Sequence, residues 1–401
     1  MRRILLLLLY LLGSGGTIVA QNADTTVLQP RKATIGLGKG LAYRTPGDGF
    51  SLTAHLRMQS LVGTSFDRDF SLTELEARVK QVLLKFEGHV HSPKLTYALL
   101  LGFAGQAANS RGYSNILYDA MIYYRPARAW SLGLGQTKVR ASRAHINSSG
   151  LLQFADRSIV NGEFSPDRDF GLFVQYDLPR DRGFTFTSKL SVTMGEGRNW
   201  GKSTNGGLLY TRRLELYPLG RFKAKGETSE SDLAHEEEVR ILLAGAYSYN
   251  HKAIRARGQR GELLPDGATR NMGCYYVDFL LKYRGFAGCI DFMGRTCSRP
   301  FVGEGESAAW VYTGCGLNVQ AGYLIAGKWE AALRNSTLFP RSEIRERAGY
   351  RRRNQTTLGV ARYLRGQALK VQANVSYNHR EQAAASDYTR WQMALQLQVE
   401  L

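Results

Sequence analysis

The last eleven residues of the chain alternate between apolar and polar side chains. The apolar residues share one parity: Trp391, Met393, Leu395, Leu397, Val399 and Leu401. The residues between them, from Gln392 to Glu400, are polar apart from Ala394. Successive side chains of a β-strand point to opposite faces, so this segment would be apolar on one face and polar on the other. Such a strand is typical of a membrane barrel with lipid outside and water inside.

The first twenty residues have the pattern of a secretory signal. Arg2 and Arg3 precede an apolar run, and Ala20 ends a small-residue cleavage site. The apolar run is shorter than the ~20 residues that a membrane-spanning helix needs. We therefore expect an exported protein without a transmembrane helix. Its parts would be a cleaved signal peptide over 1–20, a periplasmic N-terminal lead-in without regular structure over 21–50, and an outer-membrane barrel over 51–401.

The same alternation recurs along most of the chain and predicts about sixteen strands. Their apolar faces lie within residues 52–58, 82–86, 95–103, 116–124, 130–134, 170–176, 184–192, 210–216, 241–249, 275–283, 286–292, 311–323, 329–333, 358–364, 369–377 and 391–401. An even number of strands is typical of single-chain outer-membrane barrels, and this size leaves an aqueous lumen. The predicted fold class is therefore all-β, a transmembrane antiparallel β-barrel.

The connections between these strands are predicted to alternate in length. Turns near residues 91, 127, 180, 285, 326 and 366 are short and expected in the periplasm. Those near 65, 110, 150, 200, 260, 303 and 345 are long and expected outside. Residues 139–168 lack alternation and form the third external loop. The charged linker 218–239 is long where this alternation predicts a short turn, so it has room for a small helix. We interpret its acidic stretch from Glu227 to Glu238 as a solvated surface.

The composition points to anionic partners. The formal net charge is +19, and an exported protein rarely meets nucleic acid. Small anions and the phosphates of membrane lipid, including lipopolysaccharide, remain as partners. All four cysteines lie between residues 274 and 315. A hairpin with its turn at Gly285-Phe286 would place Cys274 opposite Cys297. These two cysteines could then form a disulfide, and the alternative is that they remain free thiols. The chain lacks a CxxC motif, which argues against a zinc site.

Short motifs follow one another along the chain. They include Ala120–Pro126, Gly133–Lys138, Asn147–Gly150, Asp156–Ser158, Asp167–Gly171, Gly195–Trp200, Tyr217–Gly220, Tyr247–His251 and Lys282–Gly285. In this order they resemble the phosphate-selective porin O and P family of Gram-negative outer membranes, over about residues 50–401. The resemblance implies a sixteen-stranded barrel, usually a homotrimer, whose third external loop folds inward and narrows the pore. It also implies anion selectivity from arginines and lysines along the path.

Ten cations are candidates for binding the anion. Four lie in or beside the third loop: Arg140, Arg143, Arg157 and Arg168. Six more share the lumen parity of predicted strands: Lys85, Arg125, Lys189, Arg213, Lys282 and Arg295. A guanidinium group can bind phosphate or carboxylate through two hydrogen bonds, and several weak sites let the ion leave again. Arg57 and Lys370 have the same parity as the strand cations.

Two features of the lumen face complicate this assignment. Acidic residues share it, namely Glu87, Asp119, Asp177, Glu215, Asp278 and Asp291, so lumenal ion pairs are the alternative for the strand cations. Leu83, Ala98 and Leu100 occupy positions where the family resemblance implies polar or basic residues, which interrupts any continuous basic ladder.

The functional prediction is a passive water-filled channel with a preference for anions such as phosphate or related oxyanions. It would need no cofactor, no metal and no catalytic residue. One alternative is a structural or lipopolysaccharide-binding barrel with a closed pore. A second is a barrel-embedded lipid hydrolase, although the sequence contains no GxSxG or HExxH motif.

Overall fold

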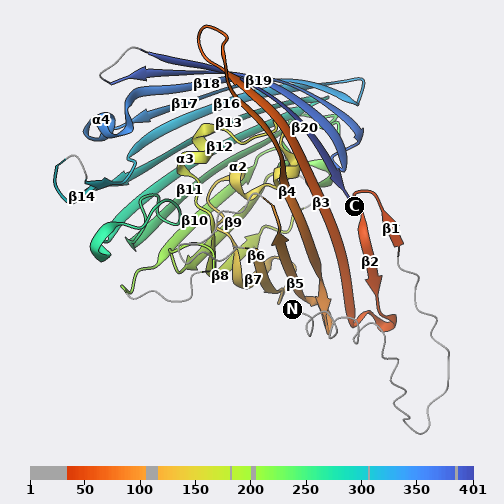
Figure 1. The fold of residues 1–401 in the computed structure, drawn as a ribbon. Coiled ribbons are helices and arrows are strands. Elements are labelled where there is room, and N and C mark those ends of the chain that lie inside the picture. The colour runs from red at the N-terminus through yellow and green to blue at the C-terminus, as the bar shows by residue number, and fades with distance from the viewer. Residues whose placement is uncertain (1–33, 105–115, 181–182, 200–204, 306–307, 384–386) are drawn as a thin grey trace, which may run out of the picture.

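The structure is a computed structural model that describes residues 34–104, 116–180, 183–199, 205–305, 308–383 and 387–401. Within these ranges, sixteen antiparallel strands close into one barrel (Figure 1). They are β3 (Phe50–Phe66), β4 (Leu72–Val90), β5 (Ser92–Gly102), β6 (Leu117–Tyr124), β7 (Trp130–Lys138), β8 (Arg168–Asp177), β9 (Thr185–Thr193), β10 (Leu209–Tyr217), β11 (Arg240–Ala253), β12 (Arg270–Tyr283), β13 (Phe286–Cys297), β16 (Gly314–Ile325), β17 (Trp329–Pro340), β18 (Tyr350–Arg365), β19 (Leu369–Gln382) and β20 (Tyr388–Glu400). The predicted fold class is confirmed, and each predicted strand has a counterpart. The predicted signal peptide lies outside the described residues.

The two faces of the wall have opposite polarity, as the alternation predicts. In β20, Leu395 and Leu397 are 53% and 42% exposed on the outside. Gln396 and Gln398 are 1% and 0% exposed on the inside, where Gln398 accepts a hydrogen bond from Gln59 of β3 at 2.6 Å. Apolar residues outside and polar residues inside are the reverse of the arrangement in a soluble protein, and they suit a barrel with lipid outside and polar contacts inside.

The barrel closes where β20 pairs with β3, from Trp391 opposite Phe66 to Glu400 opposite Arg57. Beyond the end of β20, the strands β1 (Thr34–Gly36) and β2 (Gly40–Arg44) form a hairpin, and β2 pairs with the first residues of β3. The amide of Gly38 in this hairpin donates to the Glu400 carbonyl at 2.9 Å. The described part of the lead-in thus has regular structure, because it continues the edge that β20 leaves open.

The hairpin of β12 and β13 shows why the predicted disulfide is wrong. Its two turn residues are Arg284 and Gly285, both with positive φ (45° and 87°), as in the tight turns that join twisted strands. The turn lies one residue earlier than predicted, so the pairing shifts by two. Cys274 faces Arg295 rather than Cys297, and all four cysteines are free.

One connection predicted to be long is short. Only residues 67–71 join β3 to β4, because both strands continue past the neighbouring wall, and the hairpin rises above it in Figure 1. The remaining short strands, β14 (Phe301–Val302) and β15 (Ala309–Trp310), pair with each other in the connection from β13 to β16.

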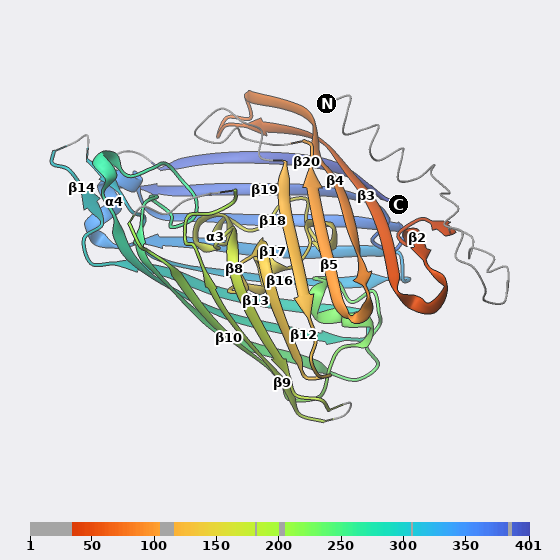
Figure 2. The ribbon, with the colours of Figure 1, turned by 90° about the horizontal axis from the view of Figure 1, so that it is seen from below.

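Two connections fold into the lumen. The third external loop contains α2 (Arg143–Ile146), the 3-10 turn η2 (Ser149–Leu151) and α3 (Ile159–Phe164). Both views place α3 inside the ring of strands (Figures 1 and 2). The linker 218–239 contains η3 (Lys223–Thr228), a 3-10 segment interrupted by two residues at positive φ. No helix in the described residues is both long enough and apolar enough to cross a membrane.

The interpretation of the acidic stretch in the linker as solvated surface holds for Glu237 and Glu238, which are exposed, but is wrong for three other acids. Asp232 and Glu236 are fully buried, and Glu230 is nearly so. The amide of Glu230 donates to the carbonyl of Leu151 in the third loop at 3.1 Å. The two inward segments therefore touch inside the barrel. The remaining short helices, η1 (Pro46–Asp48), η4 (Pro265–Gly267), η5 (Ser342–Ile344) and α4 (Arg345–Ala348), lie in other connections.

Candidate functional site

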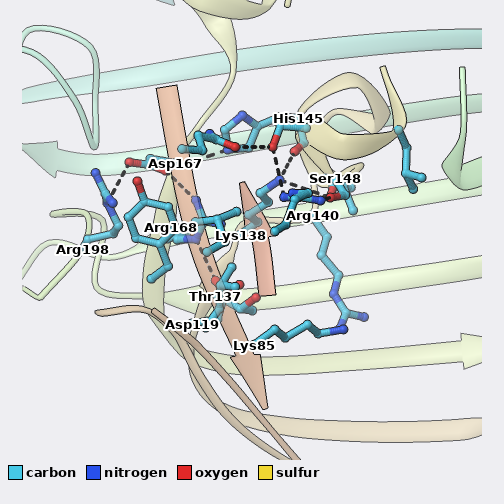
Figure 3. A pocket seen from close by; sticks show the side chains of 18 of the residues that line it. Lys85, Asp119, Thr137, Lys138, Arg140, His145, Ser148, Asp167, Arg168 and Arg198 are labelled. Atoms are coloured by element: carbon cyan, nitrogen blue, oxygen red, sulfur yellow. Dashed lines mark hydrogen bonds and ion pairs between the residues drawn. The ribbon is translucent and has the colours of Figure 1, made fainter. Parts of the chain in front are cut away.

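A cavity of about 740 Å³ lies between the third loop and the wall from β3 to β9. Among the described lining residues, eight lysines and arginines face three carboxylates. The cations are Arg57, Lys85, Lys138, Arg140, Arg157, Arg168, Lys189 and Arg198, and the carboxylates are Asp119, Asp167 and Glu400. Figure 3 shows several of them converging from the wall and the loop on one space. The excess of cations makes this space attractive to anions.

One side of the cavity holds two guanidinium groups against the same ring. The Cζ atoms of Arg168 and Arg198 lie 4.5 and 4.6 Å from the ring centre of Tyr118. Arg168 also forms an ion pair with Asp119, with 2.7 Å between Nε and Oδ1, and Arg198 one with Asp167, with 3.3 Å between Nε and Oδ2. The stacking and the ion pairs fix both planar groups in place.

Arg140 is one of the cavity cations that have no carboxylate partner among the described residues. Its Nη1 donates to Oε1 of Gln175 at 2.5 Å, and its Cζ lies 5.8 Å from the ring centre of Tyr123. It makes no ion pair with any carboxylate in the described part of the chain. Its charge is therefore available to an anion in the cavity.

Lys138 of β7 ties the loop to the wall, and Arg157 ties two parts of the loop to each other. Lys138 donates to the carbonyls of His145, Ile146 and Asn147 at 2.7 to 3.3 Å, and Arg157 donates to the Asn147 carbonyl at 2.7 Å. Burial lowers the pKa of Arg157 to about 10, so it stays charged at neutral pH. Arg157 also lines a second cavity of about 190 Å³. Its side chain therefore lies at the boundary between the two cavities.

Five of the ten predicted cations line the main cavity: Lys85, Arg140, Arg157, Arg168 and Lys189. Lys85 and Lys189 each have a carboxylate partner, with 2.6 Å between Lys85 Nζ and Glu87 Oε2 and 2.7 Å between Lys189 Nζ and Glu215 Oε1. The ion pairs considered as the alternative for strand cations thus form even within the cavity.

The other five do not line it. Arg125 is exposed at the short turn after β6. Arg213 is fully buried between Glu215 and Asp278, and Arg143 is buried with 3.8 Å between its Nη2 and Oδ1 of Asp291. These contacts form a packed polar network, so Arg143 and Arg213 do not line a path for ions.

Lys282 and Arg295 support the inward segments. Lys282 donates to the carbonyls of Gly226 and Ser231 in the linker at 2.8 and 2.6 Å. Arg295 donates to the carbonyl of Glu163 in α3 at 2.8 Å. Strand parity correctly places both side chains inside the barrel, but it does not reveal that a folded segment covers them.

Three cations of the cavity are absent from the ten predicted anion-binding residues. Arg57 shares the lumen parity, so the sequence signal for it existed. Lys138 belongs to the Gly133–Lys138 motif and Arg198 to the Gly195–Trp200 motif. Their nearness to Arg168 comes from the pairing of β7 with β8 and from the return of the next external loop.

Known proteins resemble this chain in two ways. Residues 53–206 match the model of the family described as phosphate-selective porin O and P. The solved structure of the outer membrane channel DcaP of Acinetobacter baumannii is 12% identical, with a TM-score of 0.56, and the alignment covers 90% of this chain and all of that one. No curated protein sequence matches.

Two further structures share the architecture. The anion-selective porin from Comamonas acidovorans is 9% identical with a TM-score of 0.52, over 88% of this chain and 100% of that one. The trimer form of OmpT from Vibrio cholerae is 10% identical with a TM-score of 0.53, over the same shares. At these identities the likeness shows the fold alone. Residues 53–206 thus carry the signature of the phosphate-selective porin O and P family, within a chain that has the fold of an outer-membrane porin.

Proposed function

We propose that the protein is a passive outer-membrane porin whose cavity favours anions, most simply phosphate or related oxyanions. The observation that carries the proposal is the excess of cations along the cavity wall, with Arg140 free of any carboxylate among the described residues. The family match supports the same function. Diffusion through such a channel needs neither a cofactor nor an energy source.

The arrangement suits conduction better than tight capture. Lys85 and Lys189 remain paired with carboxylates, so each offers an anion only part of its attraction. An ion that passes several partly neutralised cations is drawn in without being trapped at one of them. Arg140 raises the local anion concentration between them.

The reversal potential in a KCl gradient across a planar bilayer tests the selectivity. We expect the purified protein to prefer chloride over potassium. A unit charge about 6 Å from an ion in water contributes about 0.7 kcal/mol, favourable for chloride and unfavourable for potassium, so Arg140→Gln should lower the permeability ratio roughly three- to tenfold. Arg125→Gln is the matched control, because Arg125 is exposed at a turn away from the cavity. Cation preference in the unaltered protein would contradict the proposal.

Phosphate is tested separately. Adding phosphate to a chloride background should reduce the single-channel current in steps or as excess noise, because a slower oxyanion occupies the cations that chloride uses. An anion-selective channel whose current phosphate leaves unchanged would exclude phosphate as the preferred solute and retain the general anion preference.

We further propose that the protein assembles as a homotrimer after export by its signal peptide. The trimer form of the Vibrio cholerae OmpT structure supports the assembly by analogy of fold. Native mass spectrometry in detergent, with N-terminal sequencing of the membrane-inserted protein, measures both properties. A monomer, or a mature chain that still begins at Met1, would contradict them.

A further inference from the structure

The cavity has an apolar patch that an inorganic anion does not need. Leu83 of β4 lies opposite Arg57 in the sheet, and Leu100 of β5 lies opposite Lys85. All four side chains line the cavity, where Leu100 is half-buried and Leu83 is 6% exposed, so Leu100 presents the larger apolar surface. On this wall, leucines and cations therefore alternate as direct neighbours across the strands.

The third loop adds apolar groups to the same space. Ile146 at the end of α2 and Leu151 at the end of η2 both line the cavity, and both are half-buried. The ring of Tyr118 lies beneath the stacked pair Arg168 and Arg198. Apolar surface thus comes from the wall and from the loop that folds against it.

Hydrated phosphate or chloride gains nothing from such surface. Leucine on the lumen face of a water-filled barrel costs free energy unless something apolar covers it. Cationic groups beside apolar surface instead match a solute that carries a charge at one end and hydrocarbon at the other. Ligand sites of 300 to 1,000 Å³ commonly combine apolar lining with a few polar anchors, and this cavity of about 740 Å³ falls in that range.

We infer that the cavity binds organic anions with an apolar body, such as aliphatic or aromatic carboxylates and phosphonates, more strongly than inorganic phosphate. The anionic head would contact Arg140 or Lys85, and the body would cover Leu100 and the accessible edge of Leu83. This inference rests on the proposed anion channel and specifies which anions the same cavity prefers.

A series of probes with one head group isolates the apolar contribution. Methylphosphonate and phenylphosphonate differ only in the apolar substituent. We expect phenylphosphonate to block the chloride current at a roughly tenfold lower concentration than methylphosphonate, because burying about half of the ring has an effect of that size. Equal blocking concentrations for the two probes would overturn the inference.

Substitutions then locate the effect. Leu83→Asn and Leu100→Asn together should reduce the tenfold difference to twofold or less and leave block by methylphosphonate unchanged. Leu61→Asn is the control, because Leu61 faces the lumen from β3 but lines the second cavity. A difference that persists in the double variant places the apolar contact elsewhere and overturns the assignment to these leucines.

The outcomes separate this inference from the proposed function. The reversal potential in KCl, recorded on the same channels, reports anion preference independently of the probes. Anion preference without discrimination between the phosphonates refutes only the inference, whereas cation preference refutes the proposed function. Should the double variant fail to fold, as judged by heat-dependent electrophoretic mobility, the two probes on the unaltered protein still decide.

Discussion

Replacing Lys282 by methionine should loosen the linker 218–239 inside the barrel. Lys282 is 1% exposed, and its ammonium group donates to the carbonyls of Gly226 and Ser231 at 2.8 and 2.6 Å. A hydrogen bond that involves a charged group contributes about 1.5 to 3 kcal/mol, so two of them contribute about 3 to 6 kcal/mol. Methionine has a similar length and avoids the cost of burying an ammonium, which offsets part of this loss. We expect the docking of the linker to weaken by about 2 to 4 kcal/mol.

Other contacts keep the linker from leaving altogether. Asp232 accepts a hydrogen bond from the Gly285 amide at 2.8 Å, and the Ser231 hydroxyl donates to Glu330 at 2.7 Å. The variant should therefore fold with the linker in place but opening more often. A loss of 2 to 4 kcal/mol raises the open population roughly 30- to 1,000-fold, and the exchange of buried amides such as that of Glu230 should accelerate by the same factor.

Hydrogen exchange by mass spectrometry on the protein in detergent measures this acceleration. Single-channel recording gives an independent result. Opening the linker would expose a second route past Glu230, Asp278, Asp291 and Glu330, so conductance should rise while anion preference falls. Lys328→Met is the matched control, because Lys328 is exposed at the turn between β16 and β17. Unchanged exchange together with unchanged conductance in Lys282→Met would refute the role assigned to Lys282.

Three further predictions concern the loops and the thiols. Burial raises the pKa of Glu196 to about 7, so the folded surroundings of Glu196 favour the protonated acid and lose stability as pH rises from about 4.5 to 7. After correction for intrinsic rates, exchange around Glu196 should be faster at pH 8 than at pH 5, and Glu196→Gln should remove that dependence; a pH-independent unaltered protein contradicts this. Glu163→Gln leaves the buried guanidinium of Arg295 without its carboxylate, 3.3 Å away, and should lower the free energy of unfolding by about 3 kcal/mol in denaturant titrations, whereas a loss under 1 kcal/mol would show that the pair contributes little. Alkylation under denaturing conditions without reductant should label four thiols. Labelling of only two thiols would show that a disulfide is present and would contradict the structure.

The strands could be predicted because their signal is local. Leu395 and Gln396 reveal their two faces within two residues, and the same period marks every strand. The turn between β12 and β13 carried a weaker signal. Arg284 adopts positive φ, which a non-glycine residue rarely does, so the sequence favoured a turn one residue later and a disulfide that does not form.

The candidate site was only half predictable for a different reason. Lys85 and Lys282 share the lumen parity, yet Lys85 lines the cavity and Lys282 lies beneath the linker. Parity states which side of the wall a residue faces but not what occupies that side. The contact of Lys282 with Gly226 joins residues 56 positions apart, and no local pattern encodes it. Arg143 and Arg213 failed as pore residues for the same reason.

The hairpin of β1 and β2 has a consequence for assembly. It occupies the edge of β3 directly below the last residue of β20, and Leu401 exchanges backbone hydrogen bonds with Leu56 beside it. Its contact with Glu400 cannot form until the final strand has docked. The pairing of this hairpin with β3 needs only neighbouring strands, but its contact with Glu400 forms only on a closed barrel, so a nascent chain that lacks its last strand leaves the hairpin incompletely bound.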